Sequence, residues 1–197
     1  MPFTFFGTEI ESGYQCYPKN VACYHAKGEY LTYLDYDNEM LPNKLQILYD
    51  AITEGKVWDD FTYGKRNYII ERDECEEKVE IGDKEIELPE GESALVPWTA
   101  QTVAFMSQNP LHGFVDTGDI MIAKGALWRV QLATQMMWNE GMRRFGDWEL
   151  IVRGANFAGL RGKAVDEVVQ NYYWHGKNLQ LTRGANEGVD KRALGDG

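Results

Sequence analysis

The pattern of apolar residues changes near the middle of the chain, between Pro89 and Pro97. Before this segment, apolar residues alternate with polar ones in short runs, which is typical of strands. After it, they recur mainly three and four positions apart, which is typical of helices. Strands followed by helices favour the α+β class. We therefore predict an α+β fold with a strand-rich N-terminal half, containing one short helix and a β-hairpin, and a mainly helical C-terminal half.

The β-hairpin is the clearest local prediction. Val79 and Ile81 alternate with charged residues, and so do Ile86 and Leu88 on the return. The two runs are separated by Gly82-Asp83, and glycine at the first central position suits a type II′ turn. One face of this hairpin is apolar and the other carries mostly carboxylates.

The remaining elements are predicted from apolar periodicity and from proline and glycine positions. The segment 148–157 fits a helix or a strand, because Gly154 and Gly159 argue against one unbroken helix. The predicted strands are 3–6, 29–36 and 66–71, and the predicted helices are 42–55, 99–107, 123–145 and 161–174.

The chain of 197 residues, 44% of them hydrophobic, is long enough for one sizeable core. We predict a single α+β domain over 1–184, with a strand-rich acidic part over 1–97 and a helical part over 98–184. A polar segment at 185–197 is predicted to be a mobile tail. We expect no membrane association and a cytoplasmic location, that of the host cell if the protein is viral, since no long apolar run and no signal-peptide pattern is found.

Charge is distributed unevenly along the chain. The net charge is -11 overall, with 21 acidic and 9 basic residues in 1–97 and 10 acidic and 11 basic residues in 98–197. Acidic residues are densest between Glu71 and Glu92, and such a density repels the phosphates of nucleic acids. Specific nucleic-acid binding is therefore not expected.

Tryptophan and arginine are interleaved in the second half, and both residue types are enriched at the centres of protein interfaces. Halves of unlike charge favour head-to-tail contacts, which close into rings or stack into tubes. We therefore expect a non-enzymatic structural subunit that assembles with copies of itself or with another protein, by analogy with viral connector or tail components. The interface candidates are Trp128, Arg129, Trp138, Arg143, Arg144 and Trp148.

The motifs of common enzymes and metal sites are absent from the sequence. Three cysteines are an odd number and predict free thiols rather than a disulfide framework. The spacing of Cys16, Cys23 and His25 does not fit structural zinc, so no metal and no cofactor is predicted. The catalytic candidates are Cys23, His25 and His112, with the first two facing the same way if their segment is a strand.

Paired carboxylates occur at Asp35 and Asp37 and at Asp59 and Asp60, and Asp116-Thr117-Gly118-Asp119 contains the Asp-Thr-Gly triplet of aspartic proteases. Such pairs perform acid–base catalysis only when burial separates their pKa values. The sequence by itself does not select one of them.

The segment 105–122, FMSQNPLHGFVDTGDIMI, resembles part of the NADAR family, in which a QNP-x-L run leads to a TG turn. The resemblance implies an ADP-ribose-linked glycosidase. It covers about 18 residues, and the family's Trp-Gly element and Glu-His-Tyr segment have no counterpart, so no functional residue is transferred. The alternative to an assembly subunit is therefore a small intracellular hydrolase or such a glycosidase, with its site where the two halves meet, near the loop 110–119.

Overall fold

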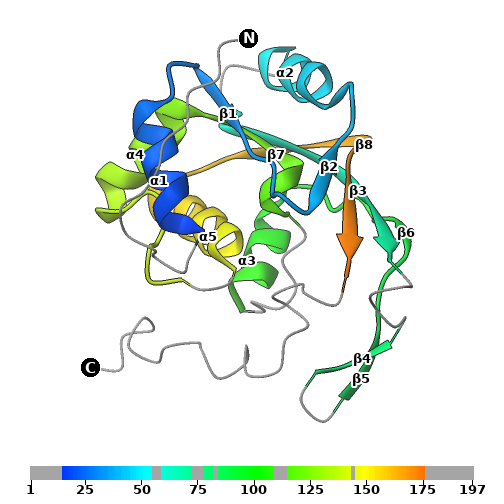
Figure 1. Cartoon of the computed structure of the whole chain (residues 1–197). Helices are drawn as coiled ribbons and strands as arrows, with labels where there is room; N and C mark the ends of the chain where they lie inside the picture. Colours follow the sequence, from blue (N-terminus) through cyan, green and yellow to red (C-terminus); the bar gives the residue numbers. More distant parts are fainter. Residues whose placement is uncertain are drawn as a thin grey trace.

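The computed structural model describes residues 15–54, 59–71, 78–81, 84–108, 115–142 and 145–175. Helices and strands are mixed along both halves of the chain (Figure 1). In chain order they are α1 (Cys16–His25), β1 (Tyr30–Thr32), β2 (Asn38–Met40), α2 (Lys44–Glu54), β3 (Phe61–Ile70), β4 (Lys78–Ile81), β5 (Lys84–Glu87), β6 (Gly91–Glu92), α3 (Ala100–Gln108), β7 (Ile120–Ala123), α4 (Lys124–Thr134), α5 (Gly146–Ala158) and β8 (Gly162–Trp174).

One mixed sheet joins the two halves of the chain. Its strand order is β1-β7-β3-β8-β2, and β6 adds to β3. The central pair, β3 and β8, is parallel, and the other pairs are antiparallel. Because β7 and β8 of the second half lie between strands of the first half, the acidic half and the nearly neutral half of the sequence do not form separate lobes.

Helices cover the sheet on both faces. On one face, α2 packs Leu48 and Ile52 against Met121 of β7 and Val169 of β8. On the other face, Phe61 and Ile122 contribute to a larger core with side chains of α1, α3, α4 and α5. This arrangement of helices on a mixed sheet confirms the predicted α+β class.

The strand β8 corrects a prediction, because the segment 161–174 is not an amphipathic helix. Its pairing with β3 shifts register twice, between Tyr63 and Lys65 and between Lys65 and Arg66, so that β8 has extra residues opposite β3. Such bulges interrupt the strict alternation of a strand and place apolar residues at helix-like spacing. The many valine, tyrosine and tryptophan residues of this segment favour a strand buried on both faces.

The long helix predicted over 123–145 is also wrong. Residues Ile120–Ala123 form β7, and α4 ends at Thr134, followed by Gln135 in the left-handed conformation at φ 63°. Beyond that point, Trp138 enters the core, where its backbone N–H and C=O bind the side-chain amide of Asn20 at 2.9 Å each. Tertiary burial of this segment therefore overrides its helical periodicity.

Other predictions are confirmed in outline. The helices α2 and α3 and the hairpin strands β4 and β5 form where the sequence indicates. The segment 148–157, for which the sequence allowed a helix or a strand, belongs to the helix α5. The helix α1 was not predicted, and only Tyr30–Thr32 of the segment 29–36 forms a strand. The predicted strand 3–6, the turn 82–83 and the tail 185–197 lie outside the described residues. Among the described helices, none is both long and apolar enough to cross a bilayer.

Gly64 allows β3 and β8 to approach closely at the register shift. A Cβ atom at this position would lie 2.5 Å from Cγ1 of Val169 and 2.8 Å from the backbone oxygen of Glu167. We predict that Gly64→Ala lowers the free energy of unfolding by about 1–3 kcal/mol, measured by urea denaturation. Gly125→Ala is the control, because a Cβ there has no neighbour within 4 Å, and it should leave stability unchanged or slightly higher. Equal losses in the two variants would contradict this packing.

A candidate carboxylate site at the junction of the two halves

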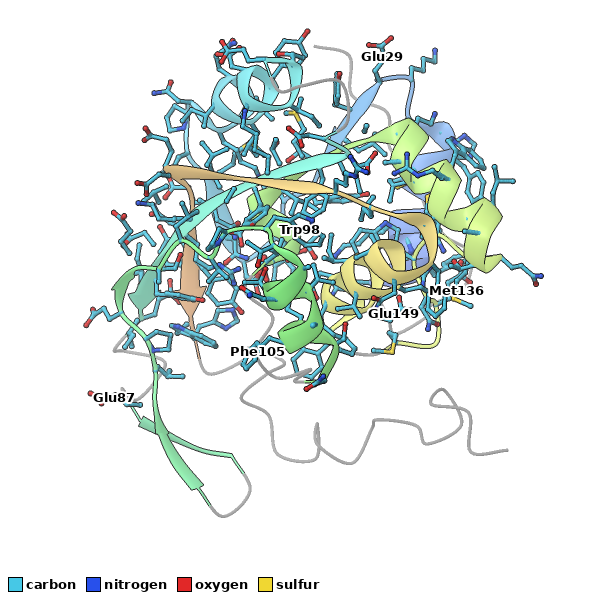
Figure 2. The ribbon with its side chains drawn as sticks, turned by 180° about the vertical axis from the view of Figure 1, so that it is seen from behind. Glu29, Glu87, Trp98, Phe105, Met136 and Glu149 are labelled. Carbon is cyan, nitrogen blue, oxygen red and sulfur yellow. The ribbon has the colours of Figure 1, made fainter. Side chains whose placement is uncertain are left out.

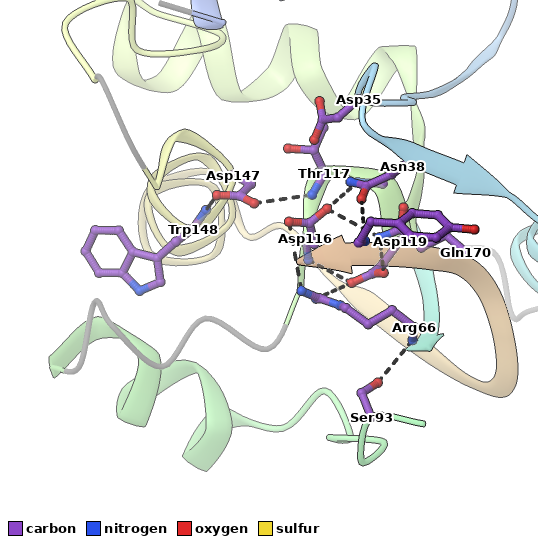
Figure 3. A network of polar contacts seen from close by, with 12 residues as sticks. Asp35, Asn38, Arg66, Ser93, Asp116, Thr117, Asp119, Asp147, Trp148 and Gln170 are labelled. Carbon is purple, nitrogen blue, oxygen red and sulfur yellow. Dashed lines mark hydrogen bonds and ion pairs between the residues drawn. The ribbon is translucent and has the colours of Figure 1, made fainter. Parts of the chain in front are cut away.

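A buried ion pair joins the central strand β3 to the turn before β7. Arg66 of β3 pairs with Oδ2 of Asp119, and its second terminal nitrogen lies 3.9 Å from Oδ2 of Asp116 (Figure 3). From β8, the amide nitrogen of Gln170 donates to Oδ1 of Asp119 at 2.8 Å. In the sheet register, Arg66 is directly opposite Gln170, which places both on one face of the β3–β8 pair. The pairing of the two halves therefore positions this polar group.

The turn Thr117–Asp119 holds its two carboxylates by local hydrogen bonds. Oδ1 of Asp116 accepts the N–H of Gly118 at 2.9 Å, and Oδ2 of Asp119 accepts the N–H of Asp116 at 2.8 Å. This reciprocal capping fixes both side chains relative to the backbone. A Cβ on Gly118 would lie 2.0 Å from Oε1 of Gln170, so only glycine allows the turn to sit this close to β8.

A buried lysine supports the same turn from the other side of the sheet. Lys44, at the start of α2, donates to the backbone oxygen of Gly118 at 2.5 Å and to that of Tyr33 at 3.1 Å. Burial lowers the pKa of Lys44 to about 8, although Asp119, Asp116 and Asp35 oppose this shift. This ammonium group links α2 to both the turn and the loop before β2.

Asp35 forms the accessible side of the cluster. Its Oδ1 lies 3.8 Å from Nζ of Lys19, and its side chain is 30% exposed. Lys19, from α1, also donates to Oγ1 of Thr117 at 3.0 Å and lies 4.9 Å above the ring of Trp138. These contacts connect α1, the loop at residues 33–37 and the turn at residues 117–119.

The N-terminus of α5 adds a fourth carboxylate. Oδ2 of Asp147 accepts the N–H of Thr117 at 3.2 Å, and its Oδ1 accepts the N–H of Trp148 at 2.9 Å. An acidic side chain in the first turn of a helix is favoured by the partial positive charge there. Figure 3 shows Asp147 beside Thr117, and Asp35 on the side of Thr117 away from Arg66.

Carboxylates outnumber cations in this cluster, which holds four aspartates against three basic side chains. The members are Asp35, Asp116, Asp119, Asp147, Lys19, Lys44 and Arg66. Burial raises the pKa of Asp35 to about 6, opposed by Lys19, and raises that of Asp119 to about 6, opposed by Arg66. Burial and the charge of Asp116 also raise the pKa of Asp147. Burial acts against the charge of Arg66, but Asp119 and Asp116 outweigh it, so the pKa of Arg66 lies above its usual range.

An aromatic strip continues the polar cluster along the same two strands. The pair Tyr68 and Tyr172 follows Arg66 and Gln170 in the sheet register, and Trp174 comes next on β8. The ring of Trp174 stacks on Tyr68 with centroids 5.9 Å apart and meets Tyr172 edge-on at 5.0 Å. The indole nitrogen of Trp174 is buried and has no hydrogen-bond partner among the described residues. Next to this strip, His175 and Asp37 are joined by a contact of 3.2 Å.

The catalytic candidates named from sequence lie apart from this cluster. Cys23 and His25 belong to a helix, not a strand, so they point in different directions. Cys23 is buried, its sulfur lies 3.2 Å from the hydroxyl of Tyr33, and burial raises its pKa, which disfavours the reactive thiolate. His25 is exposed, and His112 lies outside the described residues.

The interface candidates named from the sequence differ in their exposure to solvent. Trp128 is 37% exposed on α4, and Arg129 beside it is exposed and pairs with Asp60 at 2.6 Å. Trp138 is 1% exposed and lies in the core, so it offers no surface to a partner. Trp148 is partly buried and donates its indole N–H to the backbone of Met106 at 2.9 Å. Arg143 and Arg144 lie outside the described residues.

Two groups of carboxylates noted in the sequence belong to this region of the structure, but the sequence did not distinguish them from other carboxylate pairs. The pair Asp35 and Asp37 and the Asp116–Asp119 turn are both in or next to the cluster. Arg66, Asp147 and Gln170 had no local signal, because the pairing of β3 with β8 brings Arg66 next to Gln170, and the packing of α5 brings Asp147 to Thr117. Within the described ranges, no group of three potential ligands is arranged to hold a metal ion.

Comparison with protein-family models and with curated proteins returns no match to this chain. The short resemblance at residues 105–122 is therefore without further support. The function has to be argued from the cluster itself.

The raised carboxyl pKa values predict an unusual dependence of stability on pH. A group whose pKa is higher in the folded state binds its proton more tightly when folded, so stability rises as the pH falls through the folded pKa. We predict that the free energy of unfolding increases from pH 7.5 to pH 5.0, with Asp35 contributing on the order of 1 kcal/mol.

The check is urea denaturation of the wild type and of Asp35→Asn at both pH values. The amide imitates the protonated carboxyl, so this variant should be more stable than the wild type at pH 7.5 and should show a smaller increase at pH 5.0. An identical pH dependence in the two proteins would refute the assignment to Asp35.

Proposed function

We propose that this protein is a small hydrolase whose site is the carboxylate cluster, with Asp35 as the proton donor and acceptor. The observation that supports this proposal most is the excess of aspartates around Asp35, in a site built by six separate segments. Buried groups that keep opposite protonation states near neutral pH are typical of acid–base catalysis. Asp35 is suited to the role because it combines a pKa of about 6 with access to solvent.

The charges of the cluster favour a substrate without a phosphate at the reacting centre. The three described cations of the cluster, Lys19, Lys44 and Arg66, are already engaged with oxygen atoms of the chain. An excess of carboxylates instead stabilises positive charge, as develops on the sugar carbon when a glycosidic bond breaks. A glycoside is therefore the substrate class that this electrostatic arrangement supports best.

In the proposed reaction, the protonated carboxyl of Asp35 gives its proton to the leaving group as the bond to the sugar carbon breaks. Water supplies the hydroxyl group to that carbon and returns a proton to Asp35, so that the site is restored. We assign to Asp116 the stabilisation of the developing positive charge, because the N–H of Gly118 fixes its carboxylate and its side chain keeps 11% exposure. Gln170 and Arg66 act as positioning residues for the turn.

We predict that Asp35→Asn lowers the hydrolysis rate at least 100-fold, since a positioned general acid contributes about 10²–10⁴-fold. The measurement is release of reducing sugar from a panel of methyl pyranosides and furanosides, whose leaving group must be protonated. The rate should fall on the alkaline side of about pH 6, where Asp35 loses its proton.

Glu54→Gln, at the exposed end of α2, is the matched control and should keep the wild-type rate. Circular dichroism establishes that both variants are folded. Absence of turnover across the panel, or a rate that Asp35→Asn leaves within twofold, would contradict the proposal.

Self-assembly is the second candidate function, and large exposed apolar side chains favour it. Leu132 of α4 is 84% exposed, next to Trp128 on the same helix. Interfaces bury such groups, and a separate contact surface does not conflict with a catalytic cluster inside the fold.

A further inference from the structure

We infer that Lys19 of α1 is a positioning residue of the proposed site, which holds Asp35 in place and sets the pH range over which Asp35 gives up its proton. The inference rests on the proposed function, because it gives Lys19 a part in the same reaction. Three observations carry it. The ammonium group of Lys19 has a fixed position, it lies next to Asp35, and the other charged groups around Asp35 are mostly acidic.

The ammonium group of Lys19 is held from several sides. Its Nζ donates to Oε1 of Gln15 at 2.5 Å and to Oγ1 of Thr117 at 3.0 Å. It also lies 4.9 Å from the centre of the Trp138 ring, which is a cation–π contact. An ammonium group is otherwise free to move at the end of a flexible four-carbon chain. With these contacts and a side chain that is only 11% exposed, the charge of Lys19 has a defined place.

The helix α1, which carries Lys19, is itself anchored. Asn20, the next residue, exchanges two hydrogen bonds with the backbone of Trp138. Cys16 packs against the start of α5, since a Cβ on Gly146 would lie 2.5 Å from its Sγ. Figures 1 and 2, drawn from opposite sides, both show α1 next to α5. The position of Lys19 is therefore set by the packing of α1 and not by Asp35.

The loop before β2 brings Asp35 to this fixed charge. Oδ1 of Asp35 lies 3.8 Å from Nζ of Lys19. The ring of Tyr33, two residues earlier, is 5.8 Å from the same Nζ, and the backbone oxygen of Tyr33 accepts a hydrogen bond from Lys44. The backbone oxygen of Asp35 accepts the N–H of Asn38 at 3.2 Å. Both partners of the ion pair are thus held by contacts outside the pair.

The charges around Asp35 give Lys19 its effect on the proton. Three acidic groups face Asp35 from its own loop, from the turn before β7 and from α5, and they are Asp37, Asp116 and Asp147. Burial and these groups favour the protonated carboxyl, whereas Lys19 favours the carboxylate. Lys44, at the start of α2, is a second cation that interacts with Asp35. Lys19 therefore lets Asp35 both release and take back its proton close to neutral pH, as a general acid–base group must.

The test is a ¹³C NMR titration of the Asp35 carboxyl carbon in variants of the full chain. Lys19→Met and Lys19→Gln both remove the charge, and Lys19→Gln keeps a hydrogen-bond donor. Each should raise the midpoint of Asp35 by about one pH unit or more, as expected for the loss of an opposite charge at about 4 Å in a partly buried site. Lys19→Arg keeps the charge and should stay close to the wild-type midpoint.

Lys27→Met is the matched control, because it removes the same charge from the exposed loop after α1. Figure 2 shows Glu29 of this loop at the edge of the molecule, pointing away from its body. Salt and water screen such a charge, so the midpoint of Asp35 should move by less than about 0.3 pH units. Circular dichroism and a thermal melt establish that every variant is folded.

The same variants distinguish this inference from the hydrolase proposal. With a wild type that releases sugar, Lys19→Met should move the alkaline limit of the rate upward by the same amount as the NMR midpoint, and Lys27→Met should not. A raised midpoint without any sugar release would overturn the hydrolase proposal but support the action of Lys19 on Asp35. A midpoint that neither Lys19→Met nor Lys19→Gln raises, or that Lys27→Met raises equally, would overturn the inference.

Discussion

The ion pair between Arg66 and Asp119 is the interaction on which the centre of this structure depends. A buried charge is tolerated only when it is paired and its remaining hydrogen-bonding positions are filled. Here the partners of the pair come from β3, from the turn before β7 and, through Gln170, from β8. Three features keep Arg66, Asp119 and Gln170 in contact. They are the register of the central strands, the capped turn and the glycine at position 118.

That constraint also explains the unusual chemistry around it. Once Asp119 and Asp116 are held next to Arg66, the adjoining Asp147 and Asp35 lie in an environment with more carboxylates than cations. The fold therefore keeps Asp35 close to its protonation midpoint near neutral pH, while its partial exposure leaves it accessible. A purely structural cluster has no need of an accessible carboxyl with a raised pKa, which is why we favour a catalytic role.

The sequence predicted the class of the fold, the hairpin and the helices α2 and α3, because their signals are local. It failed for β8, where two register shifts give a strand the apolar spacing of a helix. It failed for the end of α4, where Asn20, more than 100 residues away in sequence, binds the backbone of Trp138. For the candidate site, the sequence offered Asp35 with Asp37 and the Asp116–Asp119 turn among several carboxylate groups and did not select one of them. Arg66, Asp147 and Gln170 could not be predicted, because they are distant in sequence and only the folded chain brings them to this turn.

Burial and neighbouring carboxylates raise the pKa of Asp35, which keeps this group close to its protonation midpoint near neutral pH. The most direct measurement is a ¹³C NMR titration of the aspartate carboxyl carbons, with the Asp35 signal assigned by comparison with Asp35→Asn. We predict a midpoint near pH 6 for Asp35. A midpoint below pH 4, the value of an ordinary solvated aspartate, would contradict it.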